Sequence, residues 1–183
     1  MRKTNLTYLL VFSLLVAIFG FNCGSSSNYY VSNEEPPKYK LENIQNIYVS
    51  PIPLNPDNWK TYGYGTKQEW ENTIKEMNKF FTKQMKAHRS GKYKVYVSNL
   101  KDVSNRDGVY VKIKIDSINM GSAVEPATSK MNLVFTNMKK KKVVYKANVT
   151  FSSSGIGYSA YSAEGRLSEL IDSIDDFIIS RFK

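Results

Sequence analysis

Cysteine and histidine are almost absent from this sequence of 183 residues, which contains one of each, Cys23 and His88. A single cysteine excludes an intramolecular disulfide. A single histidine cannot supply the several histidine ligands of a typical zinc site, and it is the only residue that could serve as the base of a serine triad. We therefore expect no catalytic residues, no metal site and no cofactor.

Glycine is also sparse, and neither of its close pairs makes a nucleotide-binding loop. The segment Gly155–Ala160 fits the letters of the dinucleotide-binding turn G-x-G-x-x-A. That motif needs a later strand with an acidic residue about 20 positions on, and here this distance falls inside an expected helix. The segment Gly63–Thr66 lacks the spacing of a P-loop. Both glycine pairs are interpreted as turns.

Long apolar runs are limited to one, from residue 9 to residue 21. Arg2 and Lys3 precede this run, and Cys23 follows it directly after Asn22. Positive charge, apolar core and processing site, in that order, are typical of a secretory signal peptide. A membrane-spanning helix needs about 20 apolar residues, more than this run provides. We expect residues 1–22 to be a signal peptide.

The residues around the cysteine, Phe19–Cys23, resemble a lipobox, the site at which bacterial lipoproteins are lipidated and cleaved. The usual pattern has leucine three places before the cysteine and small residues just before it. Gly20 and Phe21 depart from that pattern, whereas Asn22 is tolerated in the looser, spirochaetal-type lipoboxes. The resemblance implies a lipid on Cys23. Gly24 stands where an acidic residue would retain such lipoproteins in the inner membrane, which implies the outer membrane.

The segment after Cys23 is rich in serine, asparagine, glutamate and proline, and it has no apolar period up to residue 40. Such a composition cannot bury enough apolar surface to offset its ordering entropy. We expect residues 23–43 to be a lipidated N-terminus and flexible tether, and residues 44–183 to form one domain. The net charge is +10, and it falls to +8 when removal of the signal takes away Arg2 and Lys3.

The periodicity of residues 44–183 predicts a strand, a helix, four strands and a final helix. Thr66–Glu69 is a capping box, which predicts the start of the first helix. The first helix carries an apolar stripe at helical spacing, made of Trp70, Ile74, Met77, Phe81 and Met85. The expected strands lie at residues 47–52, 93–97, 109–116, 131–135 and 143–151, and residues 137–142 connect the last two as a hairpin.

The final helix is predicted to be strongly amphipathic. Its apolar side consists of Leu167, Leu170, Ile171, Ile174, Phe177, Ile178 and Phe182. Its other side, expected to face solvent, carries Glu169, Asp172, Asp175 and Asp176. The acidic side could in principle hold a divalent cation, but a solvated face is the usual meaning of such charges.

These elements predict an α+β fold with a single mixed, mostly antiparallel sheet and two amphipathic helices packed on it, in the order β-α-β-β-β-β-α. The first strand–helix–strand unit, residues 47–97, is expected to pair in parallel by a right-handed crossover. The order is similar to that of small periplasm-facing domains of outer-membrane lipoproteins, such as the curli-secretion lipoprotein and the activators of penicillin-binding proteins. The resemblance covers about residues 44–182 and carries over no functional residue.

Two features indicate binding. Lys139, Lys140, Lys141 and Lys142 place four positive charges at the hairpin tip, either to bind anions or to keep an edge from pairing with other chains. Trp59, Tyr62 and Tyr64 crowd one loop, where aromatic side chains either bind a partner or fill the core.

Together these features favour a membrane-anchored, non-enzymatic domain that binds an envelope protein, peptidoglycan or anionic lipid. The alternative is a surface-exposed adhesin that binds acidic host glycans or matrix. Nucleic acid is not an expected partner, because export removes the opportunity.

Overall fold

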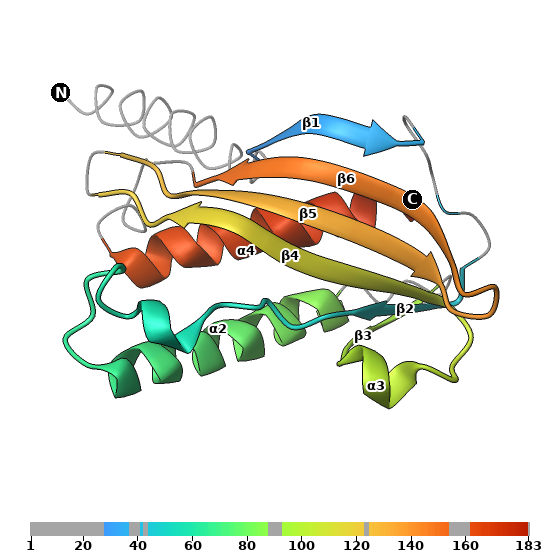
Figure 1. Cartoon of the computed structure of the whole chain (residues 1–183), viewed down its shortest axis with the longest axis horizontal. Helices are drawn as coiled ribbons and strands as arrows, with labels where there is room; N and C mark the ends of the chain where they lie inside the picture. The colour runs from blue at the N-terminus through green and yellow to red at the C-terminus, as the bar shows by residue number, and fades with distance from the viewer. Residues whose placement is uncertain are drawn as a thin grey trace, which may run out of the picture.

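The computed structural model describes residues 28–36, 41, 44–87, 93–122, 125–153 and 162–182. Within them the chain forms one six-stranded mixed sheet and three α-helices, which confirms the predicted α+β class (Figure 1). The strands are β1 (Tyr29–Glu35), β2 (Asn46–Val49), β3 (Lys94–Val97), β4 (Val109–Asn119), β5 (Thr128–Asn137) and β6 (Lys142–Ser152). The helices are α2 (Lys67–Ala87), α3 (Leu100–Val103) and α4 (Ala163–Ser180), and a 3-10 turn, η1, covers Pro56–Asn58. No helix in these ranges is long and apolar enough to span a bilayer.

The strands lie in the order β1-β6-β5-β4-β2-β3. Strand β2 pairs in parallel with both β3 and β4, and every other pairing is antiparallel. The predicted parallel unit over residues 47–97 is therefore confirmed, with α2 as its connection. The predicted hairpin is confirmed too, because Asn137 at the end of β5 pairs with Lys142 at the start of β6.

Helix α2 begins at the predicted capping box. The Thr66 hydroxyl accepts the Glu69 amide at 3.2 Å, and the Glu69 carboxylate accepts the Thr66 amide at 3.0 Å. These two bonds satisfy amides that the first turn of a helix otherwise leaves unpaired. The predicted stripe of α2 faces the core, where four of its members are buried and Ile74 is partly buried. The buried members are Trp70, Met77, Phe81 and Met85.

All seven residues of the predicted apolar side are buried, six of them in helix α4 and Phe182 just after its end. One part of the prediction for this helix is wrong, because Asp175 is only 4 % exposed and does not face solvent. Asp172 is partly buried and accepts a hydrogen bond at 2.8 Å from the side-chain amide of Gln84 in α2. The reason is that α4 packs against β6 and also against α2, so burial extends beyond a single stripe.

The partial burial of Asp172 predicts that the stability of the fold depends on pH in the acidic range. Burial raises the pKa of its carboxyl above the ordinary value of 3.8; the hydrogen bond from Gln84 opposes this rise, and nearby Asp176 and Glu169 add to it. The Asp172 carboxyl therefore keeps its proton to a higher pH in the folded state than in the unfolded state. The free energy of unfolding consequently falls as the pH rises from about 3.8 through the folded pKa. Asp172→Asn should flatten this fall in urea unfolding measured across the acidic range. An unchanged pH profile would contradict the assignment.

Strand β1 lies inside the segment predicted to be a flexible tether, residues 23–43, and that prediction is wrong for Tyr29–Glu35. These residues pair antiparallel with β6, from Tyr29 opposite Phe151 to Glu35 opposite Lys146. The Tyr29 ring packs edge-on against Phe177 of α4, with centroids 5.2 Å apart. The folded domain therefore begins well before residue 44.

A partly buried polar cluster connects β1 to the end of α4. A bulge between Val31 and Asn33 shifts the alternation of β1, so that Glu34 faces the helices. The Tyr145 hydroxyl donates a hydrogen bond to Glu34 at 2.6 Å, and Arg181 lies 3.5 Å from the same carboxylate oxygen. The Arg181 guanidinium also lies 4.5 Å from the centre of the Phe177 ring. Burial, foremost, and the hydrogen bond to Glu34 raise the pKa of Tyr145.

The hydrophobic core lies between one face of the sheet and helices α2 and α4 (Figure 1). A second, smaller cluster lies on the opposite face, at the end where α3 sits. It consists of Tyr48, Val103, Tyr110 and Met138, with Tyr96 packed against it. Away from this cluster, the opposite face carries mainly polar and charged side chains from β1, β4, β5 and β6, with the exposed Tyr30 and the partly buried Val134 among them.

Candidate functional site

The four predicted lysines project from the turn that joins β5 to β6, here called the lysine tip (Lys139–Lys142). All four are exposed. The base of the turn is held, because the Asn137 side chain accepts the Lys140 amide at 2.8 Å and the Met138 amide donates to the Gly108 carbonyl at 2.9 Å. The buried Met138 side chain fixes the tip to the smaller cluster, so the lysines are presented on a held turn rather than a loose loop.

Lys141 adopts a left-handed backbone conformation, with φ at 48°. A side chain with a Cβ atom costs roughly 1 kcal/mol or more in this region, whereas glycine adopts it freely. The turn thus carries one of its four lysines at a position where glycine would be more stable. Strain that is kept in this way is a reason to look for function.

A row of three tyrosines lies beside the lysine tip. Tyr96, Tyr48 and Tyr110 are neighbours across β3, β2 and β4, on the face turned away from α2 and α4. Tyr48 and Tyr96 stack with centroids 5.4 Å apart and planes 20° apart. The pKa of Tyr48 is raised chiefly by burial, while Arg106 opposes that rise.

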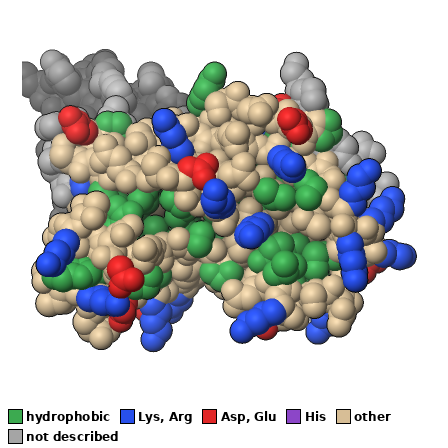
Figure 2. Space-filling model, viewed as in Figure 1, with side chains coloured by type: hydrophobic (Ala, Val, Ile, Leu, Met, Phe, Trp, Pro, Cys, Tyr) green, Lys and Arg blue, Asp and Glu red, His purple; other side chains and the backbone are tan. Residues whose placement is uncertain are grey.

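A hollow of about 580 Å³ opens next to these rings. Its walls include Tyr48 and Tyr96 together with the charged Asp102, Arg106 and Asp107. The segment that carries Arg106 leads into Gly108, whose carbonyl binds the turn of the lysine tip. Arg106 therefore adds a cation to this end of the molecule, although Asp102 and Asp107 in the same wall offset its charge. Figure 2 shows Lys and Arg side chains gathered at the same end, where the hairpin closes.

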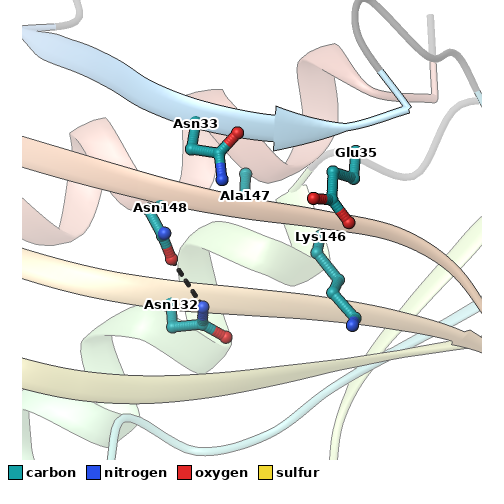
Figure 3. Close-up of a pocket in the computed structure, with 6 residues that line it drawn as sticks. All are labelled: Asn33, Glu35, Asn132, Lys146, Ala147 and Asn148. Atoms are coloured by element: carbon teal, nitrogen blue, oxygen red, sulfur yellow. Dashed lines mark hydrogen bonds between the residues drawn. The ribbon is translucent and has the colours of Figure 1, made fainter.

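The uncovered sheet face continues away from the tip as a polar surface. Asn33, Asn148 and Asn132 lie in one row across β1, β6 and β5, and the Asn132 amide donates to Asn148 at 2.5 Å (Figure 3). Glu35 and Lys146 complete the wall of a shallow hollow of about 160 Å³ there. Four lysines of this face are exposed, namely Lys112, Lys114, Lys130 and Lys146. The face is thus suited mainly to polar contacts, with the exposed Tyr30 ring as an aromatic surface beside them.

The predicted aromatic loop lies at the other end of the sheet, so the structure does not bring it together with the lysine tip. Tyr62 and Tyr64 flank the buried Trp70, each with a centroid distance of 4.9 Å. Trp59 is partly exposed, and the Lys60 ammonium lies 5.1 Å from the centre of its ring. Tyr62 and Tyr64 therefore serve core packing at least in part.

The remaining candidates, Cys23, His88 and the segment Gly155–Ala160, fall outside the described residues. In the part of the chain that the structure describes, no group of three or more His, Cys, Asp or Glu residues is placed to hold a metal ion.

No protein-family model matches this sequence, and no curated protein matches it either. Several solved bacterial structures show a remote likeness, among them three from different organisms. The PelC dodecamer from Paraburkholderia phytofirmans is 8 % identical with a TM-score of 0.47, over 85 % of this chain and 99 % of that one. A DUF330 protein from Xanthomonas campestris is 12 % identical with a TM-score of 0.39, over 79 % and 85 %. A putative neuraminyllactose-binding hemagglutinin homolog from Helicobacter pylori is 11 % identical with a TM-score of 0.34, over 81 % and 89 %. Likenesses this remote are not evidence of shared function.

Proposed function

We propose that this chain is a lipid-anchored protein of the bacterial outer membrane whose folded domain binds an anionic partner and catalyses no reaction. Residues 1–22 serve as the export signal, and Cys23 carries the lipid. The export pattern and the lone cysteine support the anchor. Added lipid mass on the mature protein, measured by mass spectrometry, tests this part of the proposal.

The observation that carries the binding role is the lysine tip. Its four lysines are exposed, and among the described residues none of them forms an ion pair. Clustered like charges repel one another, so an anion that binds there relieves repulsion as well as gaining attraction. Partners of suitable chemistry are an acidic envelope protein, the carboxylates of peptidoglycan and anionic lipid headgroups.

Replacing all four tip lysines with glutamine should slow association with an anionic partner. Exposed charges mainly accelerate encounter and are screened by salt, so we expect about a tenfold lower association rate constant at low salt. The dependence of the rate on salt should flatten as well. Biolayer interferometry can measure both quantities with polyglutamate, purified peptidoglycan or phosphatidylglycerol vesicles as the probe.

A matched control removes the same charge elsewhere. Lys75, Lys79, Lys83 and Lys86 are exposed on α2 and can be replaced by glutamine together. This variant should keep most of the association rate, because its lysines lie on the helical side of the sheet. Equal slowing in both variants would mean that net charge and not the tip governs binding. Unchanged association of the tip variant, with more light scattering, would show that the tip lysines only prevent strand pairing.

A further inference from the structure

The two ends of the sheet differ in chemistry, and hydrogen bonds identify which end the anchor enters. The Asn28 carbonyl, just before β1, accepts the Ser152 amide at the end of β6. Ser152 pairs with Thr128 in β5, which pairs with Asn119 in β4. We call this the anchor end. The lysine tip closes the opposite ends of β5 and β6.

The aromatic loop belongs to the anchor end. Thr61, Tyr62 and Gly63 share the wall of a hollow of about 380 Å³ with Asn119 and with other residues at the end of β4. The Tyr64 hydroxyl donates a hydrogen bond at 3.4 Å to Glu164, in the first turn of α4. The start of β1 and the aromatic loop therefore lie at one end of the molecule.

The length of chain before β1 limits how far this end can move from the anchor. Five residues lie between Cys23 and Tyr29 in the sequence, which makes six Cα-to-Cα steps. Each residue spans at most about 3.6 Å, so the start of β1 lies within roughly 20 Å of the lipid-bearing residue, whatever the path between them. This step rests on the proposed lipidation of Cys23.

The lysine tip is much farther away along the sheet. Strand β6 runs 11 residues from Lys142 to Ser152. At about 3.3 Å per residue, the tip lies on the order of 35 Å from the anchor end. An anchor attached at one end of an elongated sheet thus leaves the other end free to project.

The side chains of the anchor end suit a membrane surface. Trp59 and Tyr62 each pack against the core and are partly exposed, and the ammonium of the exposed Lys60 lies over the Trp59 ring. Tryptophan and tyrosine concentrate at the membrane–water interface, where an apolar ring and a polar group are both accommodated. Lysine extends its stem along apolar surface while its ammonium stays with water and headgroups.

We propose that the anchor end of the domain contacts the anchoring membrane, with Trp59 and Tyr62 at headgroup level, and that the lysine tip points away from that membrane. The anionic partner of the tip is then a polymer or protein beyond the headgroups, and not the lipid of the anchoring leaflet. This orientation rests on the proposed function and removes the lipid of the anchoring leaflet from the possible partners of the lysine tip.

Tryptophan fluorescence of the lipidated protein in vesicles with brominated lipid tests the membrane contact. The chain has two tryptophans, and Trp70 is completely buried. Brominated lipid should therefore reduce the emission of the wild-type protein only by the share due to Trp59. Trp59→Phe should lose this quenching while the protein still floats with the vesicles. Unquenched wild-type emission would overturn the contact.

The direction of the tip is tested by a dye on an introduced cysteine, with a quencher attached to lipid headgroups. Because Cys23 is acylated, Lys140→Cys and Thr61→Cys each offer one free thiol. We expect several-fold weaker quenching at position 140 than at position 61. Equal quenching would overturn the proposed orientation. Failure of the unlabelled protein to float would overturn the anchor itself and, with it, the orientation, whereas failure to bind polyglutamate in solution would contradict only the anion-binding role.

Discussion

Replacement of Ile174 by aspartate is expected to unfold the domain. Ile174 is 1 % exposed in the centre of α4, inside the core between the sheet and the helices. A carboxylate there loses its hydration and gains no hydrogen-bond or ion-pair partner in exchange. The burial of the isoleucine side chain is lost as well. Together these losses exceed about 5 kcal/mol, which is comparable with the whole stability of many domains. Circular dichroism during thermal or urea unfolding measures the effect.

The control for this variant is Ile174→Val, which removes one methyl group and should cost roughly 0.5–1.5 kcal/mol. Asp175→Ala, which the sequence pattern would offer as a harmless change on the opposite face, is not a suitable control because Asp175 is buried. If Ile174→Asp melted at the temperature of Ile174→Val, the position of Ile174 in the core would be refuted.

Arg181→Met is expected to produce the second large loss, of about 3 kcal/mol. The methionine keeps an apolar stem but removes the guanidinium that pairs with Glu34 and lies over the Phe177 ring. Both charged side chains of this pair are mostly buried, at 16 % and 18 % exposure. Removal of one partner from such a pair is strongly destabilising, because the other charge is left without compensation. The midpoint of urea denaturation gives the magnitude.

An exposed ion pair provides the contrast. Lys67 lies only 2.7 Å from Asp57, but the two side chains are 51 % and 74 % exposed. Solvent screening makes such pairs weak even when their geometry is close. Lys67→Met should therefore change the denaturation midpoint far less than Arg181→Met, although its ion pair is the shorter one. Equal shifts would mean that burial does not set the contribution of the Arg181 pair.

The sequence predicted the elements correctly where a local sequence pattern coincides with the burial seen in the structure. The capping box at Thr66 follows from a local motif, and the stripe of α2 and the alternation of β4 follow from repeating side chains; the structure confirms all three. Strand β1 was missed because only Tyr29 and Val31 alternate before a bulge breaks the period. Asp175 was misplaced because periodicity reports one buried stripe and cannot show that a second helix packs alongside.

The candidate site likewise has parts that could be predicted from the sequence and parts that could not. The lysine tip could be predicted, because four adjacent lysines between two alternating strands are visible in the letters alone. The tyrosine row could not, because Tyr48, Tyr96 and Tyr110 meet only through the register of three strands. The aromatic loop was recognised as a cluster, but the sequence could not show that Tyr62 and Tyr64 pack on Trp70.

The pairing of β1 with β6 also bears on the order in which the chain can fold. The first strand finds its partner only near the end of the sequence: the Tyr145–Glu34 hydrogen bond joins residues 111 positions apart. Contacts of such long sequence separation form late, because a large loop must close before they contribute. While the chain is being synthesised, β1 therefore has no strand to pair with until β6 has been made. The first strand of the sheet thus waits longest for its partner, and the sheet is complete only once Lys142–Ser152 of β6 have been synthesised.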